Sequence, residues 1–349
     1  MQLRTKVCVR RVKNASIAAL LFSCGLQPVI AQSADAVVNT ADSQAQALWR
    51  RGLSNNPPSP EGCFHAAYPS LVWESVGCAA GKPRVPPAPR VRTSEAGMPN
   101  VVGNGHDWVL GATGLITAAL GGFLNVKNVK SEKGVGVASF GGGGILGPNE
   151  YTLQLNSNAN ATTSVCAGHS GCTVWEQYLY ATDYVAKGKA AVFIQYWLLD
   201  WGNSACPKGF GKSGTSCFKN SAFAAAPDMK ITQLGKLQLE GKAVPGGNDA
   251  VLFGNGTDVY SVTAKDSVLK VGLVWTQAEF NIVGNAGGSR AVFNKGVSTD
   301  VAVVVADGST AAPHCLLNAG TTGESNNLNL GNCVTAGGAN PEMEFLEAN

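Results

Sequence analysis

Two polar side chains within otherwise apolar, strand-like stretches are the strongest candidates for chemistry. Glu279 lies within residues 271–283, where alternate residues are apolar enough to be packed. A partly buried carboxyl holds its proton more tightly than an exposed one and can act as a general base or acid. Gln177 could hold a water beside that carboxyl and stabilise an oxyanion. Glu176 would instead form a two-carboxylate pair with Glu279, and strand alternation lets only one of Glu176 and Gln177 face it.

Three stretches, residues 174–180, 191–199 and 271–283, each show one face that mixes tryptophan with polar side chains. The opposite faces of the last two are apolar and read as core: Val192, Ile194, Tyr196, Leu198, Val274, Ala278, Phe280 and Ile282. If the three strands are neighbours in one sheet, their mixed faces join into a groove suited to an extended peptide or sugar. The alternative is a polar face open to solvent. The substrate-binding candidates on this surface are Trp175, Gln195, Trp197, Trp275 and Gln277.

Other chemistries find little support. The four histidines show no ligand spacing and neither CxxC nor HExxH occurs, so no metal site and no cofactor are expected. Residues 168–171 read Gly-His-Ser-Gly and lack the last glycine of a serine nucleophile motif. The formal net charge of +3 gives no basic stripe for nucleic acid. We expect a monomer that takes a polypeptide substrate or, alternatively, an extracellular glycan.

The elements that must position these residues are many short strands separated by Gly, Asn, Asp and Ser. A helical turn is expected over residues 230–239, and the Gly141–Gly144 run is expected to be a loop. Many strands and little helix predict an all-β fold, a curved antiparallel β-sandwich of the jelly-roll or concanavalin-like kind with disulfide-tied loops. The predicted strands cover residues 108–110, 115–118, 135–140, 151–156, 174–180, 190–199, 250–253, 259–262, 268–281, 291–293, 297–305 and 343–346.

The first hundred residues differ in composition from the rest. Residues 1–31 combine a basic start with the apolar run 15–26 and small residues at 29 and 31, the pattern of a cleavable signal peptide. Residues 32–100 look like a leader or propeptide that ends in a proline-rich linker, and an ordinary spacer is the alternative. The β-sandwich domain is expected over residues 101–349. No later stretch is apolar enough to span a membrane, so we expect secretion, with the periplasm or the cell surface as other destinations.

Cysteine usage fits an exported protein. Two of the ten cysteines fall in the signal region, and the other eight form close couples in the sequence. An even number in an exported chain favours disulfides over a metal site, and neighbour pairing is the simplest of several connectivities. The eight are Cys63, Cys78, Cys166, Cys172, Cys206, Cys217, Cys315 and Cys333.

The order of these motifs resembles the glutamic peptidases called eqolisins and, more distantly, the neprosin-type secreted peptidases. The family pattern has a catalytic Gln in one strand, an aromatic strand after it, and a catalytic Glu in a later strand. The corresponding stretches here are Trp175-Glu176-Gln177-Tyr178, then 193–197, then 278–283, and the likeness covers residues 101–305. Gln177 is followed here by Tyr-Leu-Tyr where the family has a glycine and an acid. The tail from Pro313 has no counterpart.

The resemblance implies a curved β-sandwich and acid-active proteolysis without a metal. In that reading Glu279 is the general base and then the acid, Gln177 orients the water and stabilises the oxyanion, and the leader inhibits the enzyme. The alternative is a non-catalytic β-sandwich that binds an extracellular glycan or peptide in the same groove.

Overall fold

The computed structural model describes residues 43–79, 101–103, 107–317 and 323–349. The predicted signal peptide and the proline-rich linker lie outside these residues. Contacts divide the chain into residues 1–31 and residues 32–349. In the described part of the chain, no helix has the length and apolar character needed to cross a membrane.

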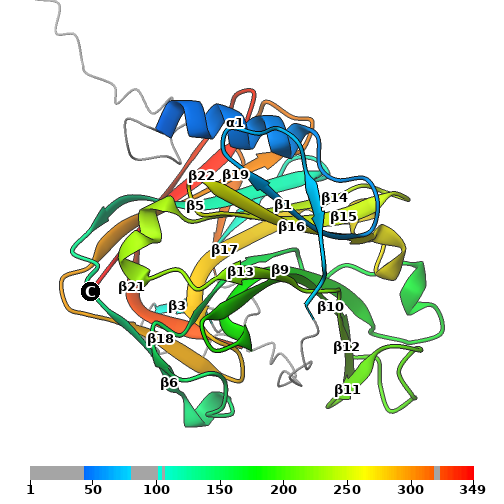
Figure 1. The fold of residues 1–349 in the computed structure, drawn as a ribbon. Coiled ribbons are helices and arrows are strands. Elements are labelled where there is room, and N and C mark those ends of the chain that lie inside the picture. The colour runs from blue at the N-terminus through cyan, green and yellow to red at the C-terminus, as the bar shows by residue number, and fades with distance from the viewer. Residues whose placement is uncertain (1–42, 80–100, 104–106, 318–322) are drawn as a thin grey trace, which may run out of the picture. The chain divides into compact units, whose positions relative to one another are not determined.

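Two mostly antiparallel sheets pack face to face, which confirms the predicted all-β sandwich (Figure 1). The larger sheet has thirteen strands, and among the described pairings β18 with β21 is the parallel one. In spatial order its strands are β2 (Glu74–Val76), β1 (Gly62–Ala67), β16 (Asp258–Lys265), β15 (Asn248–Gly254), β14 (Gln238–Ala243), β5 (Ala118–Lys127), β19 (Ser298–Ala306), β22 (Glu342–Ala348), β21 (Ser325–Ala336), β18 (Ser289–Phe293), β6 (Glu132–Gly136) and β7 (Gly147–Pro148), with β3 (Val101–Gly103) beside β21.

The smaller sheet has nine strands and carries the candidate chemistry. In spatial order they are β11 (Gly211–Ser213), β12 (Ser216–Asn220), β10 (Lys189–Leu199), β9 (Thr173–Ala186), β8 (Tyr151–Asn156), β17 (Gln277–Gly284), β4 (Trp108–Gly111) and β20 (His314–Leu317), with β13 (Ala224–Pro227) beside β10. Short 3₁₀ helices cover Ala138–Phe140, Ser164–Cys166, Ile231–Lys236, Asp266–Val268 and Val271–Leu273. The one at Ile231–Lys236 matches the expected helical turn.

The core fills the space between the sheets with the predicted apolar faces. Val192, Ile194, Tyr196 and Leu198 of β10 are buried there, and Phe280 of β17 meets Phe123 of β5 with ring centroids 5.2 Å apart. Glycine makes room for these rings. A Cβ on Gly121 would lie 2.1 Å from the ring of Phe280, and one on Gly241 would lie 2.3 Å from the ring of Tyr178.

Residues 43–79, which fall in the stretch expected to be a leader, contribute to the fold. Helix α1 (Ser43–Asn55) places Trp49 and Leu53 four residues apart, on one helix face, and both are buried on the larger sheet against Ala250 and Leu252 of β15. Strand β1 pairs along its whole length with β16. Residues 43–79 are therefore part of the β-sandwich unit that the sequence suggested would start at residue 101.

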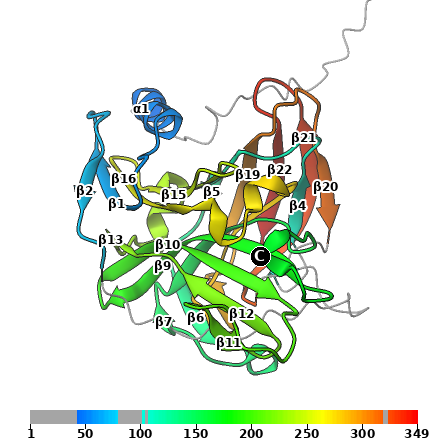
Figure 2. The ribbon, with the colours of Figure 1, turned by 90° about the vertical axis from the view of Figure 1, so that its right-hand side faces the viewer.

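Within the described ranges, four disulfides join cysteines that are neighbours in the sequence: Cys63–Cys78, Cys166–Cys172, Cys206–Cys217 and Cys315–Cys333. Cys315 lies in β20 of the smaller sheet and Cys333 in β21 of the larger one, so this disulfide links the two sheets covalently. Figure 2 shows β20 and β4 beside β21 and β22. Four disulfides are compatible with an extracellular protein.

Candidate functional site

A row of polar side chains crosses five neighbouring strands of the smaller sheet. Cross-strand register places one residue of each strand opposite the next, and facing residues in an antiparallel sheet share a face. We call this set the polar row: Glu279 of β17, Asn156 of β8, Gln177 of β9, Gln195 of β10 and Asn220 of β12.

Asn156 connects the two catalytic candidates. Its Nδ2 donates to Glu279 Oε2 at 3.3 Å, and its Oδ1 accepts from Gln177 Nε2 at 3.0 Å. Glu279, Asn156 and Gln177 are exposed by only 3%, 1% and 4%. The carboxyl and the carboxamide predicted to act together therefore lie in one buried set, bridged by a third side chain that the sequence analysis did not single out.

Trp197 fixes the orientation of the amides. Its indole N–H donates to Gln177 Oε1 at 3.0 Å and to Gln195 Oε1 at 2.9 Å, while Gln195 Nε2 donates to Asn220 Oδ1 at 2.9 Å. An indole nitrogen can only donate, so Gln177 must turn its oxygen toward Trp197 and its nitrogen toward β8. Trp175 stacks on Trp197 with ring centroids 6.2 Å apart.

A cavity of about 350 Å³ adjoins the polar row. Its walls combine amides with an apolar, aromatic side. Volumes of this size suit a ligand or a peptide side chain. The described lining residues are Gly144, Thr152, Gln154, Gln177, Leu179, Ala181, Tyr184, Phe193, Gln195, Asn285, Ala286, Gly287 and Glu324.

Two glycine turns approach each other closely at the edge of this cavity. Gly143 N donates to Gly287 O at 3.0 Å and Ile145 N donates to Asn285 O at 2.9 Å. Gly287 has φ +67°, and a Cβ there would lie 2.3 Å from Gly144 N. The glycine run expected to be a loop is thus packed backbone to backbone against the turn that follows β17.

A second amide leads from Gln177 to a second carboxyl. Gln177 Nε2 donates to Gln154 Oε1 at 3.3 Å, and Gln154 Nε2 donates to Glu324 Oε2 at 3.2 Å. Glu324 directly precedes β21, a strand of the larger sheet. Burial raises the pKa of Glu324, and hydrogen bonds from Gln154 and from the backbone of Gly288 and Gly323 act the other way. Gln177 therefore stands between two carboxyls, each reached through one amide.

More carboxyls gather beside Glu279. Asn281 Nδ2 donates to Asp107 at 3.1 and 3.2 Å and to Glu347 at 2.7 Å. Burial raises the pKa of Glu347 to about 8. Burial also raises the pKa of Asp107 well above its ordinary value, and the neighbouring charges of Glu279 and Glu347 add to this. Glu279 thus lies in a low-dielectric region that contains several carboxyls.

Glu176 and Trp275, two other site candidates, lie away from the polar row. Glu176 points between the sheets, where burial and the charge of Asp249 raise its pKa well above the ordinary value, so Gln177 rather than Glu176 shares a face with Glu279. Trp275 is fully buried against Tyr178, with ring centroids 5.5 Å apart.

The position of Trp275 has a backbone cause. The predicted strand 268–281 is wrong before Gln277, because 3₁₀ turns and a left-handed residue, Lys270 at φ +59°, interrupt it. Alternation starts only with β17, where Gln277 begins the strand on the same face as Glu279 and pairs with Gly111.

Strand alternation could have revealed Asn156 and Gln154, because Thr152, Gln154 and Asn156 occupy one face of a strand that was predicted with the correct ends. Glu324 offered no such signal, since it lies in the tail for which the sequence has no family counterpart.

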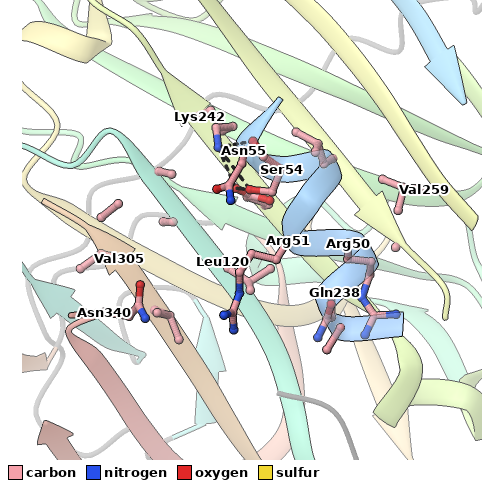
Figure 3. A pocket seen from close by; sticks show the side chains of 18 residues that line it. Arg50, Arg51, Ser54, Asn55, Leu120, Gln238, Lys242, Val259, Val305 and Asn340 are labelled. Carbon is pink, nitrogen blue, oxygen red and sulfur yellow. Dashed lines mark hydrogen bonds and ion pairs between the residues drawn. The ribbon is translucent and has the colours of Figure 1, made fainter. Parts of the chain in front are cut away.

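Another cavity, of about 210 Å³, lies between α1 and the larger sheet (Figure 3). Its best-defined polar contacts anchor the helix: Glu240 Oε1 accepts from Ser54 Oγ at 2.6 Å and from Lys242 Nζ at 3.2 Å, and Lys242 also donates to Ser54 O at 2.8 Å. We assign these three residues a structural role.

No protein-family model matches the chain, and comparisons with curated proteins and with solved structures also give no match. Within the described ranges, no group of three or more His, Cys, Asp or Glu side chains could hold a metal ion.

Proposed function

We propose that the chain is a secreted hydrolase of the glutamic-peptidase type, with Glu279 as general base and Gln177 as the group that stabilises the oxyanion. The observation that carries the proposal is the buried Glu279–Asn156–Gln177 set beside a cavity of about 350 Å³. A buried carboxyl next to oriented amide donors is the combination that hydrolysis of an amide bond requires.

In the proposed reaction Glu279 removes a proton from water as the water oxygen attacks the carbonyl carbon of the substrate. The resulting oxyanion needs a donor. Both amide hydrogens of Gln177 are engaged, at 3.0 Å by Asn156 and at 3.3 Å by Gln154. We expect the substrate oxygen to replace the longer bond. Glu279 then returns the proton to the leaving nitrogen as the C–N bond breaks, giving a carboxylic acid and an amine.

The direct test measures cleavage of a denatured protein by the purified chain from strongly acidic to neutral pH. Glu279→Gln and Gln177→Ala should abolish cleavage, while a chelator and a serine-protease inhibitor should have no effect. Glu176→Gln is the matched control, because Glu176 is equally buried and is also a strand carboxyl but faces the other side of the sheet. Cleavage that survives Glu279→Gln would refute the mechanism.

A second candidate function is binding of an extracellular peptide or glycan without catalysis. It is favoured by the cavity lining, which includes Gln154, Gln177 and Gln195 but not Glu279. If the folded protein cleaves nothing at any pH and yet binds peptides or glycans, and if Gln177→Ala weakens that binding, this second function replaces the first.

A further inference from the structure

Glu324 differs in charge from the other groups around the cavity. It is the one side chain among the described lining residues that carries an acidic or basic group, and it is only 7% exposed. Thr152, Gln154, Gln177, Gln195 and Asn285 are neutral polar residues. Among the described lining residues, the cavity therefore has one charged position, which is negative when ionised.

Another part of the cavity wall is apolar and aromatic. Leu179 and Ala181 line it from β9, together with the rings of Tyr184 and Phe193, whose centroids are 4.9 Å apart. Such a wall suits an aliphatic stem, and aromatic rings attract cations through their π faces. A long side chain with an apolar stem and a basic end matches both the wall and the carboxyl.

We infer that this cavity is a subsite for a lysine or arginine side chain of the bound polypeptide, with Glu324 as the residue that selects it. The inference rests on the proposed function for the identity of the polymer and deepens it by naming a preferred side chain. Gln154, which links Glu324 to Gln177 through bonds of 3.2 and 3.3 Å, would connect occupancy of the subsite to the catalytic amide.

A cationic ligand would also stabilise the ionised form of Glu324 in its buried position. A carboxylate removed from water is unfavourable unless hydrogen bonds or an opposite charge compensate for it. Gln154 and the backbone of Gly288 and Gly323 supply neutral hydrogen bonds to Glu324, and a substrate cation would add an opposite charge.

The test uses binding to the full chain carrying Glu279→Gln, so that turnover does not interfere. Capped peptides carrying one lysine, placed at each position in turn, are compared by calorimetry near neutral pH with peptides carrying norleucine there. At one position lysine should improve affinity about tenfold or more, because a charge-assisted hydrogen bond is stronger than a neutral one. Adding Glu324→Gln should remove this preference, whereas adding Glu132→Gln, a buried acid of β6 that does not line the cavity, should retain it.

The outcomes separate the two ideas. Peptide binding without a basic preference, or a preference that survives Glu324→Gln, overturns the subsite assignment and leaves the hydrolase proposal standing. A preference that depends on Glu324 in a chain that never cleaves supports the subsite and overturns the hydrolase. Absence of any peptide binding overturns both. If Glu324→Gln does not fold, Glu324→Asp must weaken the preference by withdrawing the charge.

Discussion

Asn281 of the smaller sheet donates a 2.7 Å hydrogen bond to Glu347 of the larger sheet. The same amide group donates to Asp107, so one carboxamide joins two buried carboxyls at the junction of the sheets. A negative charge on either carboxyl would be poorly compensated, since the described hydrogen bonds to both come from neutral donors. The folded state consequently favours their protonated forms.

We expect the protein to be most stable in acid. The pKa of Glu347 is raised to about 8 in the folded chain and is about 4.3 in an unfolded one. Its contribution to the free energy of unfolding is therefore complete below the unfolded pKa and is lost as pH rises through the folded pKa. Asp249, with a pKa raised to about 8 by burial, acts in the same direction. The loss should be on the order of a few kcal/mol.

Calorimetric melting temperatures should fall as pH rises from 5 to 9 (roughly the window between these pKa values), and Glu347→Gln should flatten the decline. A melting temperature that rises over this range would contradict the assignment.

Replacing Trp197 with phenylalanine should weaken the polar row. Trp197→Phe keeps a ring but removes the N–H shared by Gln177 and Gln195, and we expect a loss of about 1–3 kcal/mol in the free energy of unfolding. Trp175→Phe is the matched control, because the Trp175 indole nitrogen has no hydrogen-bond acceptor in the part of the chain that is described. Urea unfolding of both variants tests this. Equal losses would show that ring volume, not the shared donor, matters.

Asn156→Ala should remove hydrolysis nearly as completely as the catalytic substitutions. It deletes the bridge between Glu279 and Gln177, and a lost positioning contact of this kind costs about a hundredfold or more in rate. Asn329→Ala, at an exposed amide of β21, should leave the rate unchanged. The measurement is the initial rate of peptide cleavage with folding checked by circular dichroism. Full activity in Asn156→Ala would exclude Asn156 from the site.

The disulfide between the sheets should contribute more to the free energy of unfolding than the disulfide that closes the shortest loop. Cys315 and Cys333 are 18 residues apart, and removing their bond through the double alanine variant should cost about 3 kcal/mol. Cys166 and Cys172 close a loop of only six residues, so the corresponding variant should lose less. Because Glu324 lies between Cys315 and Cys333, the first variant should also lose the lysine preference. Retention of that preference would show that the strands alone position Glu324.

Strand alternation accounts for the parts of the fold and site that the sequence predicted well. Residues 151–156 and 190–199 have apolar inner faces, and their strands were found with ends correct to within a residue. The same alternation placed Phe280 and Glu279 on opposite faces of one strand, and Gln195 and Tyr196 on opposite faces of another. A buried face can fix both the register of a strand and the face on which each side chain lies. Where it does, the local sequence pattern is enough to predict the strand.

Features that depend on distant segments were missed. Strand β21 begins Ser-Asn-Asn-Leu-Asn-Leu and carries many polar side chains, several of them hydrogen-bonded to neighbouring strands, so its local sequence does not read as a strand. Strand β1 belongs to a segment that resembled a leader, and only its pairing with β16 makes it part of the sheet. Glu324 reaches the cavity because the strand that follows it, β21, pairs with β18 and β22, and no short stretch encodes that pairing.

Gly121 and Gly241 each leave space for an aromatic ring from the opposite sheet. A larger residue at either position requires a smaller partner, because a packed interior tolerates neither overlap nor a void. Over evolutionary time these positions should therefore change in pairs: a side chain gained at position 121 should coincide with the loss of the ring at position 280, and positions 241 and 178 should covary in the same way. Even a distantly related sequence could be aligned to this chain through those two complementary pairs.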